Sequence, residues 1–213
     1  MNIILKYLLF FWISAVIVLA LIYPIPKIGE MGDKARILYF HVPMAWVATI
    51  SFLTSFYFSV KYLRNRDINN DIIASSSAGL GLLFAVLATV TGAVWARFEW
   101  GAFWNWDPRQ TAIFILILIY GAYFALRSAV ESLEQRAKLS SVYAILAGIS
   151  VPFFIFIMPR ITDSLHPDPI INTRGKINMN TEMFMIFLAS LVGFTLLFYW
   201  MLRIKIKTEK LKL

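Results

Sequence analysis

Two histidines and a run of aromatic residues are the side chains most suited to binding a cofactor. His41 and His166 are the only histidines in 213 residues. Between them lies the segment Trp100-Gly101-Ala102-Phe103-Trp104-Asn105-Trp106-Asp107. A neutral imidazole is a strong axial ligand for haem iron, and flat aromatic rings offer apolar faces on which a tetrapyrrole can stack. These residues predict a haem site, provided that the fold brings the three segments together.

The composition predicts that most of the chain lies in a membrane. It is 60% hydrophobic and 15% charged, whereas a soluble domain is nearer half apolar and a quarter charged. The length suits one compact unit, so we expect a single integral-membrane domain over 1–213. The absence of cysteine excludes disulfides, thiolate metal ligands and thioether attachment of haem to this chain. The net charge of +8 does not indicate nucleic-acid binding, because the basic residues flank apolar runs.

Six stretches are apolar over the roughly 20 residues that a membrane helix requires. We therefore expect an all-α membrane protein, a bundle of six transmembrane helices with its functional loops on one face. No small-residue cleavage site follows the first stretch, so we expect it to be retained as a span. Pro152 lies inside the fifth stretch and predicts a kink there. The expected spans are residues 4–23, 43–61, 72–95, 111–127, 140–158 and 182–202.

The distribution of basic residues predicts the orientation of these spans. Twelve of the 20 Lys and Arg residues fall on the side that carries both termini, and eight fall on the other side. Since the richer side is expected to be cytoplasmic, both termini should lie inside and the loops 24–42, 96–110 and 159–181 outside. Those three loops share one face by parity even if the orientation is reversed. His41, the tryptophan run and His166 all belong to them.

Prolines near each histidine suggest how the imidazoles are held. Pro43 suits the first turn of a helix, so we expect His41 at or just before the start of the second span. Pro167 and Pro169 stiffen the chain directly after His166. Both imidazoles must be neutral to bind a metal. Haem occupancy is therefore expected to fall as the pH drops toward and below roughly 6.5.

The tryptophans have two interpretations. Four of the seven fall between 95 and 106, and Trp100 and Trp104 share a face if that segment is helical. A local cluster of this kind suits a platform for a flat ligand. The alternative is an aromatic belt, because tryptophan collects at membrane interfaces in any case. The composition leaves both interpretations open.

Cations near the proposed ligands could bind the two haem propionates. Arginine grips a carboxylate through two parallel hydrogen bonds. Arg36 and Arg109 are the first candidates, because each is close in sequence to another proposed haem-contacting segment. Lys34 and Arg97 are the other candidates. A metal-only site is the weaker alternative, since two histidines would need further ligands, which could be Glu99, Asp107, Asp163 and Asp168.

The segment 100–111 resembles the tryptophan-rich signature, or WWD domain, of the haem-handling proteins of cytochrome c maturation, which include the CcmC, CcmF and CcsA types. The run His41-Val42-Pro43-Met44-Ala45-Trp46 resembles the first histidine motif of the CcmC branch. The segment His166-Pro167 takes the place of the second motif, and the similarity covers nearly the whole chain. Pro108 and Gln110 lean toward the CcmF and CcsA types, but those carry additional histidines that this chain lacks.

The resemblance implies a protein of the cytoplasmic (inner) membrane that holds haem at the outer face and delivers it to a membrane-anchored haem chaperone, CcmE. It implies a complex of ABC type with an ATP-hydrolysing subunit, a second membrane subunit and a small helical peptide. The haem would be of b type, non-covalent and transiently bound, with His41 and His166 as axial ligands. The platform for haem and chaperone would be Trp100, Trp104, Trp106 and Asp107, with Arg36 and Arg109 near the propionates.

Other functions remain to be compared with this one. No nucleophile–base pair is identifiable, so we do not expect an enzyme. A b-type cytochrome subunit would usually place its histidines inside apolar helices, whereas here they lie at loops. A transporter would place ionisable groups at mid-membrane, where these spans have almost none. A CcsA-like haem exporter or synthase component is the remaining alternative.

Overall fold

The structure, a computed structural model, describes residues 3–25, 32–167 and 179–212, and these ranges contain helices and no strands. Six of its helical stretches are long and apolar enough to cross a membrane, and each overlaps one of the six expected spans, most of them extending beyond its ends. The predicted fold class, an all-α bundle of six membrane helices, is confirmed. The elements are α1 (Ile3–Ile22), the 3-10 helix η1 (Gly32–Tyr39), α2 (His41–Asn65), α3 (Ile68–Trp100), α4 (Pro108–Ala129), α5 (Leu133–Pro152), the π-helix η2 (Phe153–Ile157), α6 (Met158–Ile161) and α7 (Thr181–Lys210).

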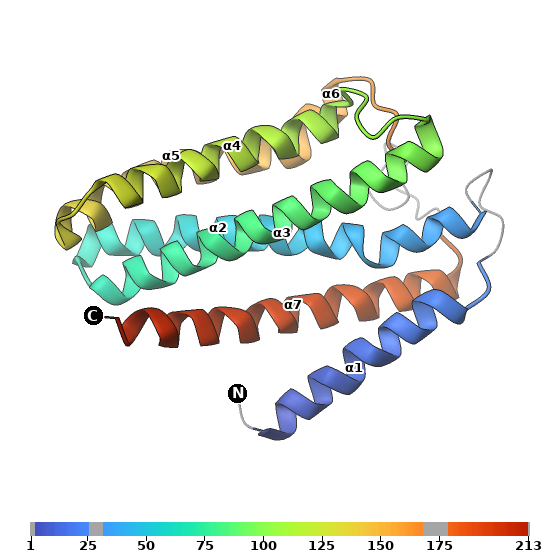
Figure 1. The fold of residues 1–213 in the computed structure, drawn as a ribbon, viewed down its shortest axis with the longest axis horizontal. Coiled ribbons are helices and arrows are strands. Elements are labelled where there is room, and N and C mark those ends of the chain that lie inside the picture. Colours follow the sequence, from blue (N-terminus) through green and yellow to red (C-terminus); the bar gives the residue numbers. More distant parts are fainter. Residues whose placement is uncertain (1–2, 26–31, 168–178, 213) are drawn as a thin grey trace.

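The long helices run along a common direction, so the loops gather at two ends of the bundle (Figure 1). Both termini lie at one end. The opposite end, which we call the site end, carries η1, the segment 101–107 and α6. Helices α2 and α3 form the central hairpin, α4 and α5 lie on one side of it, and α7 lies on the other with α1 at the periphery.

Polar caps begin four of the long helices. Each cap side chain accepts a backbone N–H of the first turn and so satisfies a group that has no partner within the helix. The caps are Asp67 for α3, Asp107 for α4, Ser132 for α5 and Asn180 for α7. Gly101 ends α3 in the left-handed region, with φ of 81°. The helix therefore stops at Trp100, and the one-face relation of Trp100 and Trp104, which required a helix there, does not hold.

Close approach of helices through small residues builds the core. The rings of Phe52 on α2 and Tyr120 on α4 stack with centroids 3.7 Å apart. A Cβ atom on Gly81 would lie 2.5 Å from the Phe52 ring. Only glycine lets α3 pack this closely on α2, which agrees with the role of small residues between membrane helices.

Helix α1 packs on α7 and leaves most of its apolar surface exposed. The indole of Trp12 donates a hydrogen bond to the carbonyl oxygen of Ala189, 2.9 Å away. The exposed side chains around the rest of α1 are large and apolar. Such a surface is unfavourable in water and is suited to lipid.

A buried ion pair joins α3 and α4 near the end that carries the termini. Arg127 donates two hydrogen bonds to the carboxylate of Asp71, over 2.6 and 2.9 Å. This parallel geometry is the strong form of the Arg–carboxylate pair. Arg127 is therefore part of the helix packing, although the sequence pattern placed it among the loop charges that report orientation.

The fifth membrane-crossing stretch changes its helical geometry at Pro152. The ring of a proline inside a helix removes one backbone hydrogen bond and crowds the preceding turn. The π-helix η2 follows directly, and α6 completes the stretch at Ile161. π-helical turns are common where a helix contributes to a functional site, and η2 contributes to the cavity described next.

A paired-histidine cavity as the candidate functional site

A cavity of about 410 Å³ opens between the helices at the site end. This volume lies within the roughly 300–1,000 Å³ of small-molecule sites. It is formed by η1, α2, α3, the segment 101–107, α4, η2, α6, the segment that follows α6, and α7. Its polar or aromatic lining includes His41, Trp46, Thr49, Thr89, Trp95, Trp104, Arg109, Gln110, Arg160 and His166. Most of the remaining lining is apolar, as expected of a site for a largely apolar ligand.

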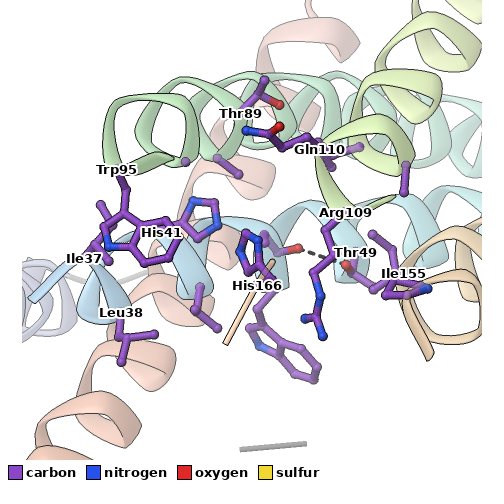
Figure 2. A pocket seen from close by; sticks show the side chains of 18 of the residues that line it. Ile37, Leu38, His41, Thr49, Thr89, Trp95, Arg109, Gln110, Ile155 and His166 are labelled. Carbon is purple, nitrogen blue, oxygen red and sulfur yellow. Dashed lines mark hydrogen bonds between the residues drawn. The ribbon is translucent and has the colours of Figure 1, made fainter. Parts of the chain in front are cut away.

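The two histidines face each other across this cavity although 125 residues separate them in the sequence. Their ring centroids are 6.2 Å apart and their planes are inclined by 37°. Figure 2 shows the two imidazoles side by side, with Trp95 and Arg109 close to them. A metal ion bound at about 2 Å by one nitrogen of each imidazole separates the ring centres by roughly 6 Å. The pair is thus spaced as two axial ligands of one iron would be.

The start of α2 and one turn of α3 orient His41. Nδ1 of His41 lies 3.1 Å from Oγ1 of Thr91. The Thr91 hydroxyl donates its hydrogen to the carbonyl oxygen of Leu87, 2.8 Å away, so its oxygen accepts from Nδ1–H. This arrangement assigns the proton to Nδ1 and leaves the Nε2 lone pair to bind a metal. Metal-binding histidines are commonly oriented in this way.

Asp107 holds the segment that carries His166. One carboxylate oxygen accepts from the backbone N–H of Arg109 at 2.9 Å and thereby caps α4. The other accepts from the hydroxyl of Ser164 at 2.9 Å and from the N–H of Leu165 at 2.8 Å. Ser164 in turn accepts from the N–H of His166 at 3.1 Å. Asp107 is buried, so the structure gives it a positioning role and no exposed surface.

Nδ1 of His166 is buried and has no hydrogen-bond partner among the described residues. The nearest Asp107 oxygen is 3.9 Å away, which is too far for a hydrogen bond. Burial is the main cause that lowers the pKa of His166 to about 4; His41 and Arg109 act in the same direction and Asp107 opposes them. A neutral, buried imidazole that lacks a partner fits a metal-binding role.

The tryptophans of the run occupy different positions around the pair. Trp95 lines the cavity and its ring centroid lies 5.7 Å from that of His166. Trp100 packs edge-on against the same imidazole at 5.4 Å. Trp104 lines the cavity, whereas Trp106 is 74% exposed and contacts Trp104 edge-on. The sequence analysis did not include Trp95 in the site. Its position five residues before Trp100, within the same tryptophan cluster, was the available signal.

Four cations were predicted to bind the haem propionates: Lys34, Arg36, Arg97 and Arg109. Of these, Arg109 alone is among the cavity-lining residues. Arg36 instead donates to the carbonyl oxygens of Ala20 and Tyr23 and to the carboxylate of Asp33. It therefore ties the end of α1 to η1. The structure pairs Lys34 with Glu99 at 3.0 Å.

Two further arginines, Arg97 and Arg160, differ in their position relative to the cavity. Arg97 donates to the carbonyl oxygen of Gly101 and lies over the ring of Phe103. Arg160 lines the cavity, and the sequence analysis had counted it only as a loop charge. Nothing in the sequence near Arg160 relates it to the histidines, because the contact is tertiary.

The metal-only alternative receives no support from the described residues. No group of three His, Cys, Asp or Glu side chains is placed to hold an ion among them. Asp107 is engaged with the loop and the α4 cap, and Glu99 pairs with Lys34. Asp163 is described and belongs to no such group. Asp168 lies outside the described residues.

The fold and the site define a multi-pass membrane protein with a paired-histidine cavity at one end of its bundle. A family model described as heme exporter protein C, CcmC, matches residues 2–213. The chain belongs to this family.

Three relatives illustrate how far the similarity extends. Heme exporter protein C of Rhodobacter capsulatus is 27% identical over 205 residues, which cover 93% of this chain and 85% of the relative. The protein of the same name from Paracoccus denitrificans is 30% identical over 191 residues, or 86% and 76%. A ccmC-like mitochondrial protein of cytochrome c biosynthesis from Marchantia polymorpha is 29% identical over 194 residues, or 89% and 82%.

Proposed function

We propose that this protein binds haem in the cavity, with His41 and His166 as axial ligands. The observation that carries the proposal is the imidazole pair, whose centroids lie 6.2 Å apart. The haem supplies an iron that accepts two nitrogen ligands. The chain supplies the two oriented imidazoles, the apolar walls that exclude water, and Arg109 as a cation for a propionate.

The haem serves cytochrome c maturation in this proposal, as the names of the relatives suggest. The protein would hold b-type haem transiently and without a covalent bond at the outer face of the cytoplasmic membrane, with both termini inside. It would pass the haem to a CcmE-like chaperone. The ATPase, the second membrane subunit and the small helical peptide of an ABC-type complex would supply the energy and the contacts for release, and the chain itself would perform no catalysis.

A haemin titration of the purified protein tests this proposal. We expect one haem per chain and the absorption spectrum of a six-coordinate, low-spin iron with two imidazole ligands. A protein that stays colourless in the presence of haemin would contradict the proposal. A five-coordinate or high-spin spectrum would contradict the ligation by both histidines.

The pH dependence of haem retention should follow the lowered pKa of His166. Its neutral form persists down to about pH 4 instead of the usual 6.5. We therefore expect retention through pH 6.5, which revises the expectation from the sequence, and loss as the pH approaches 4. The stability of the folded loop should depend on pH in the same way. Because the pKa of His166 is lower in the folded protein than in the unfolded chain, the contribution of its neutral imidazole to stability is complete above pH 6.5 and is lost as the pH falls toward 4. Soret absorbance of the loaded protein during acid titration measures this. A midpoint near 6.5 would contradict it.

Gly92 provides a test of the space around His41. A Cβ atom on Gly92 would lie 2.8 Å from Cε1 of His41, so Gly92→Ala should displace the imidazole from Thr91. We expect about tenfold weaker haemin binding, at the lower end of the effect of disturbing a ligand's support. Gly121→Ala is the matched control, because a Cβ there meets no atom within 4 Å. Equal haemin affinities of the two variants would show that the His41 imidazole can accommodate the added methyl group without losing its position.

Two tryptophans of the run should separate binding from delivery. Trp104 lines the cavity, whereas the exposed Trp106 does not. We expect Trp104→Ala to weaken haemin binding, and Trp106→Ala to bind haemin normally but to transfer it more slowly to the chaperone. Haemin titration and a transfer assay with the purified chaperone distinguish the two effects. Normal transfer by Trp106→Ala would remove this residue from the docking surface.

A further inference from the structure

We propose that the cavity opens sideways to the lipid, between Trp46 on α2 and Phe156 on η2, and that haem reaches the histidines through this opening from the outer half of the bilayer. This inference rests on the proposed function. It concerns the route to the site, which neither the ligand residues nor the family assignment specifies.

The first observation is that the lipid-facing stripes of two helices run into the cavity. On α2, Trp46 is 44% exposed and lines the cavity. It shares its helical face with the exposed Leu53 and Tyr57, seven and eleven residues later. The exposure of Trp46 therefore continues a surface that faces the surroundings of the bundle.

The same pattern holds on the opposite side of the opening. Phe156 lines the cavity and is 37% exposed. It continues an exposed apolar stripe that includes Leu146 and Ile149 on α5 and Phe153 at the start of η2. The cavity thus reaches the lipid-facing surface on both sides.

The second observation is a divergence of helices at the site end. Helix α5 packs against α2, but η2 packs against α4 and does not continue that interface. Figure 1 shows the layer of α4, α5 and α6 separating from α2 toward the site end. On the other side of Trp46 the space is closed, because its indole donates to the hydroxyl of Thr195 on α7 at 3.3 Å. The opening is therefore on the η2 side.

The depth of the opening places it within the membrane. Trp46 lies five residues inside the start of α2 at His41, and Phe156 lies five residues inside the end of α6 at Ile161. Both residues also lie inside the expected spans 43–61 and 140–158, within three residues of the outer end of each. The opening is therefore at the outer edge of a hydrocarbon core of about 30 Å.

The chemistry of the lining fits a flat apolar ring with carboxylates at one edge. Most of the lining is apolar, and three helices contribute small residues to it, Ala45, Ala88 and Ala112. The cations Arg109 and Arg160 are near the helix ends at the site end. A haem dissolved in the outer leaflet keeps its ring in hydrocarbon and its propionates at the interface, which matches this division of the cavity.

Cysteine labelling in the membrane tests the route, and the chain offers a clean background because it has no cysteine. Phe156→Cys and Trp46→Cys would be reconstituted in phosphatidylethanolamine–phosphatidylglycerol vesicles and modified with a bulky, reversible methanethiosulfonate. Haemin dissolved in protein-free vesicles is then mixed in, and the Soret band is followed in time. We expect each adduct to slow loading by about tenfold, within the usual span of association-rate changes, and a reducing agent to restore the rate.

Neighbouring lipid-facing positions provide matched controls. Ile157 is 50% exposed and Leu53 is 38% exposed, and neither lines the cavity. Adducts on Ile157→Cys and Leu53→Cys should load at the unmodified rate. If the adducts on Phe156→Cys and Trp46→Cys also load at that rate and to full occupancy, the lateral route is wrong while haem binding stands. If the Soret band of the haemin never shifts to that of the imidazole-ligated iron with the unmodified protein, the proposed function fails as well.

Discussion

His166→Ala and His41→Ala should each lower haemin affinity by at least about a hundredfold, since loss of a ligand's support alone costs ten- to a hundredfold. Each variant removes one of the two imidazoles that line the cavity with their ring centroids 6.2 Å apart. The remaining imidazole leaves a five-coordinate iron, so the low-spin spectrum should also be lost. Haemin titration with a Soret and visible-band spectrum measures both effects.

The surroundings of the two histidines make these variants informative about ligation. Asp107 anchors the His166 segment through Ser164 and Leu165, without using the imidazole. The segment should therefore stay in place in His166→Ala. Added free imidazole should then restore part of the low-spin spectrum. Unchanged haem content and spectrum in both variants would refute axial ligation by this pair.

Asp107→Ala should weaken haemin binding by about ten- to a hundredfold although this carboxylate is not a ligand, as expected of a group that holds a ligand in place. Its two oxygens accept three hydrogen bonds, from Arg109, Ser164 and Leu165. The substitution removes the α4 cap, which costs about 1 kcal/mol, and releases the His166 segment. Asp107→Asn keeps one acceptor oxygen and should fall between the wild type and the alanine variant.

Two measurements distinguish release of the His166 segment from loss of the α4 cap: hydrogen exchange at Leu165, and a variant that removes the cap of another helix. The amide of Leu165 should lose protection in Asp107→Ala. Asp67→Ala is the matched control, because Asp67 caps α3 through the N–H of Asn69 at 2.9 Å and has no contact with the cavity lining. It should lose a cap and keep haem affinity. If Asp107→Ala binds haemin as tightly as Asp67→Ala, then Asp107 has no part in positioning His166.

The spans and the meeting of the two histidines follow from simple physical rules. Membrane helices are long and apolar, and their backbone N–H and C=O groups are hydrogen-bonded within the helix. Hydropathy along the sequence therefore locates them well. Parity then requires alternate loops to share a face, and this led to the expectation that His41 and His166 share one side. The structure places them at the same end of the bundle with their ring centroids 6.2 Å apart.

Closeness in sequence to the histidines did not predict which arginines line the cavity. Arg36 is five residues before His41, yet its donors bind the end of α1. Arg160 is the cation that lines the cavity together with Arg109. Sequence distance predicts contact only within one helix, and an arginine side chain binds whichever carbonyls or carboxylates the packing brings within reach.

The sequence by itself determined the number of membrane helices, the shared face of the two histidines and the tryptophan run, and the chemical nature of the proposed ligands, because each depends on local composition or on parity. The tertiary structure decided the 6.2 Å spacing of the imidazoles, the hydrogen bond between Nδ1 of His41 and Thr91, the burial of Asp107 and the side on which we propose that the cavity opens. All of these depend on how α2, α3, α4 and η2 pack together. Packing is set by contacts between residues far apart in the chain, and no local pattern encodes them.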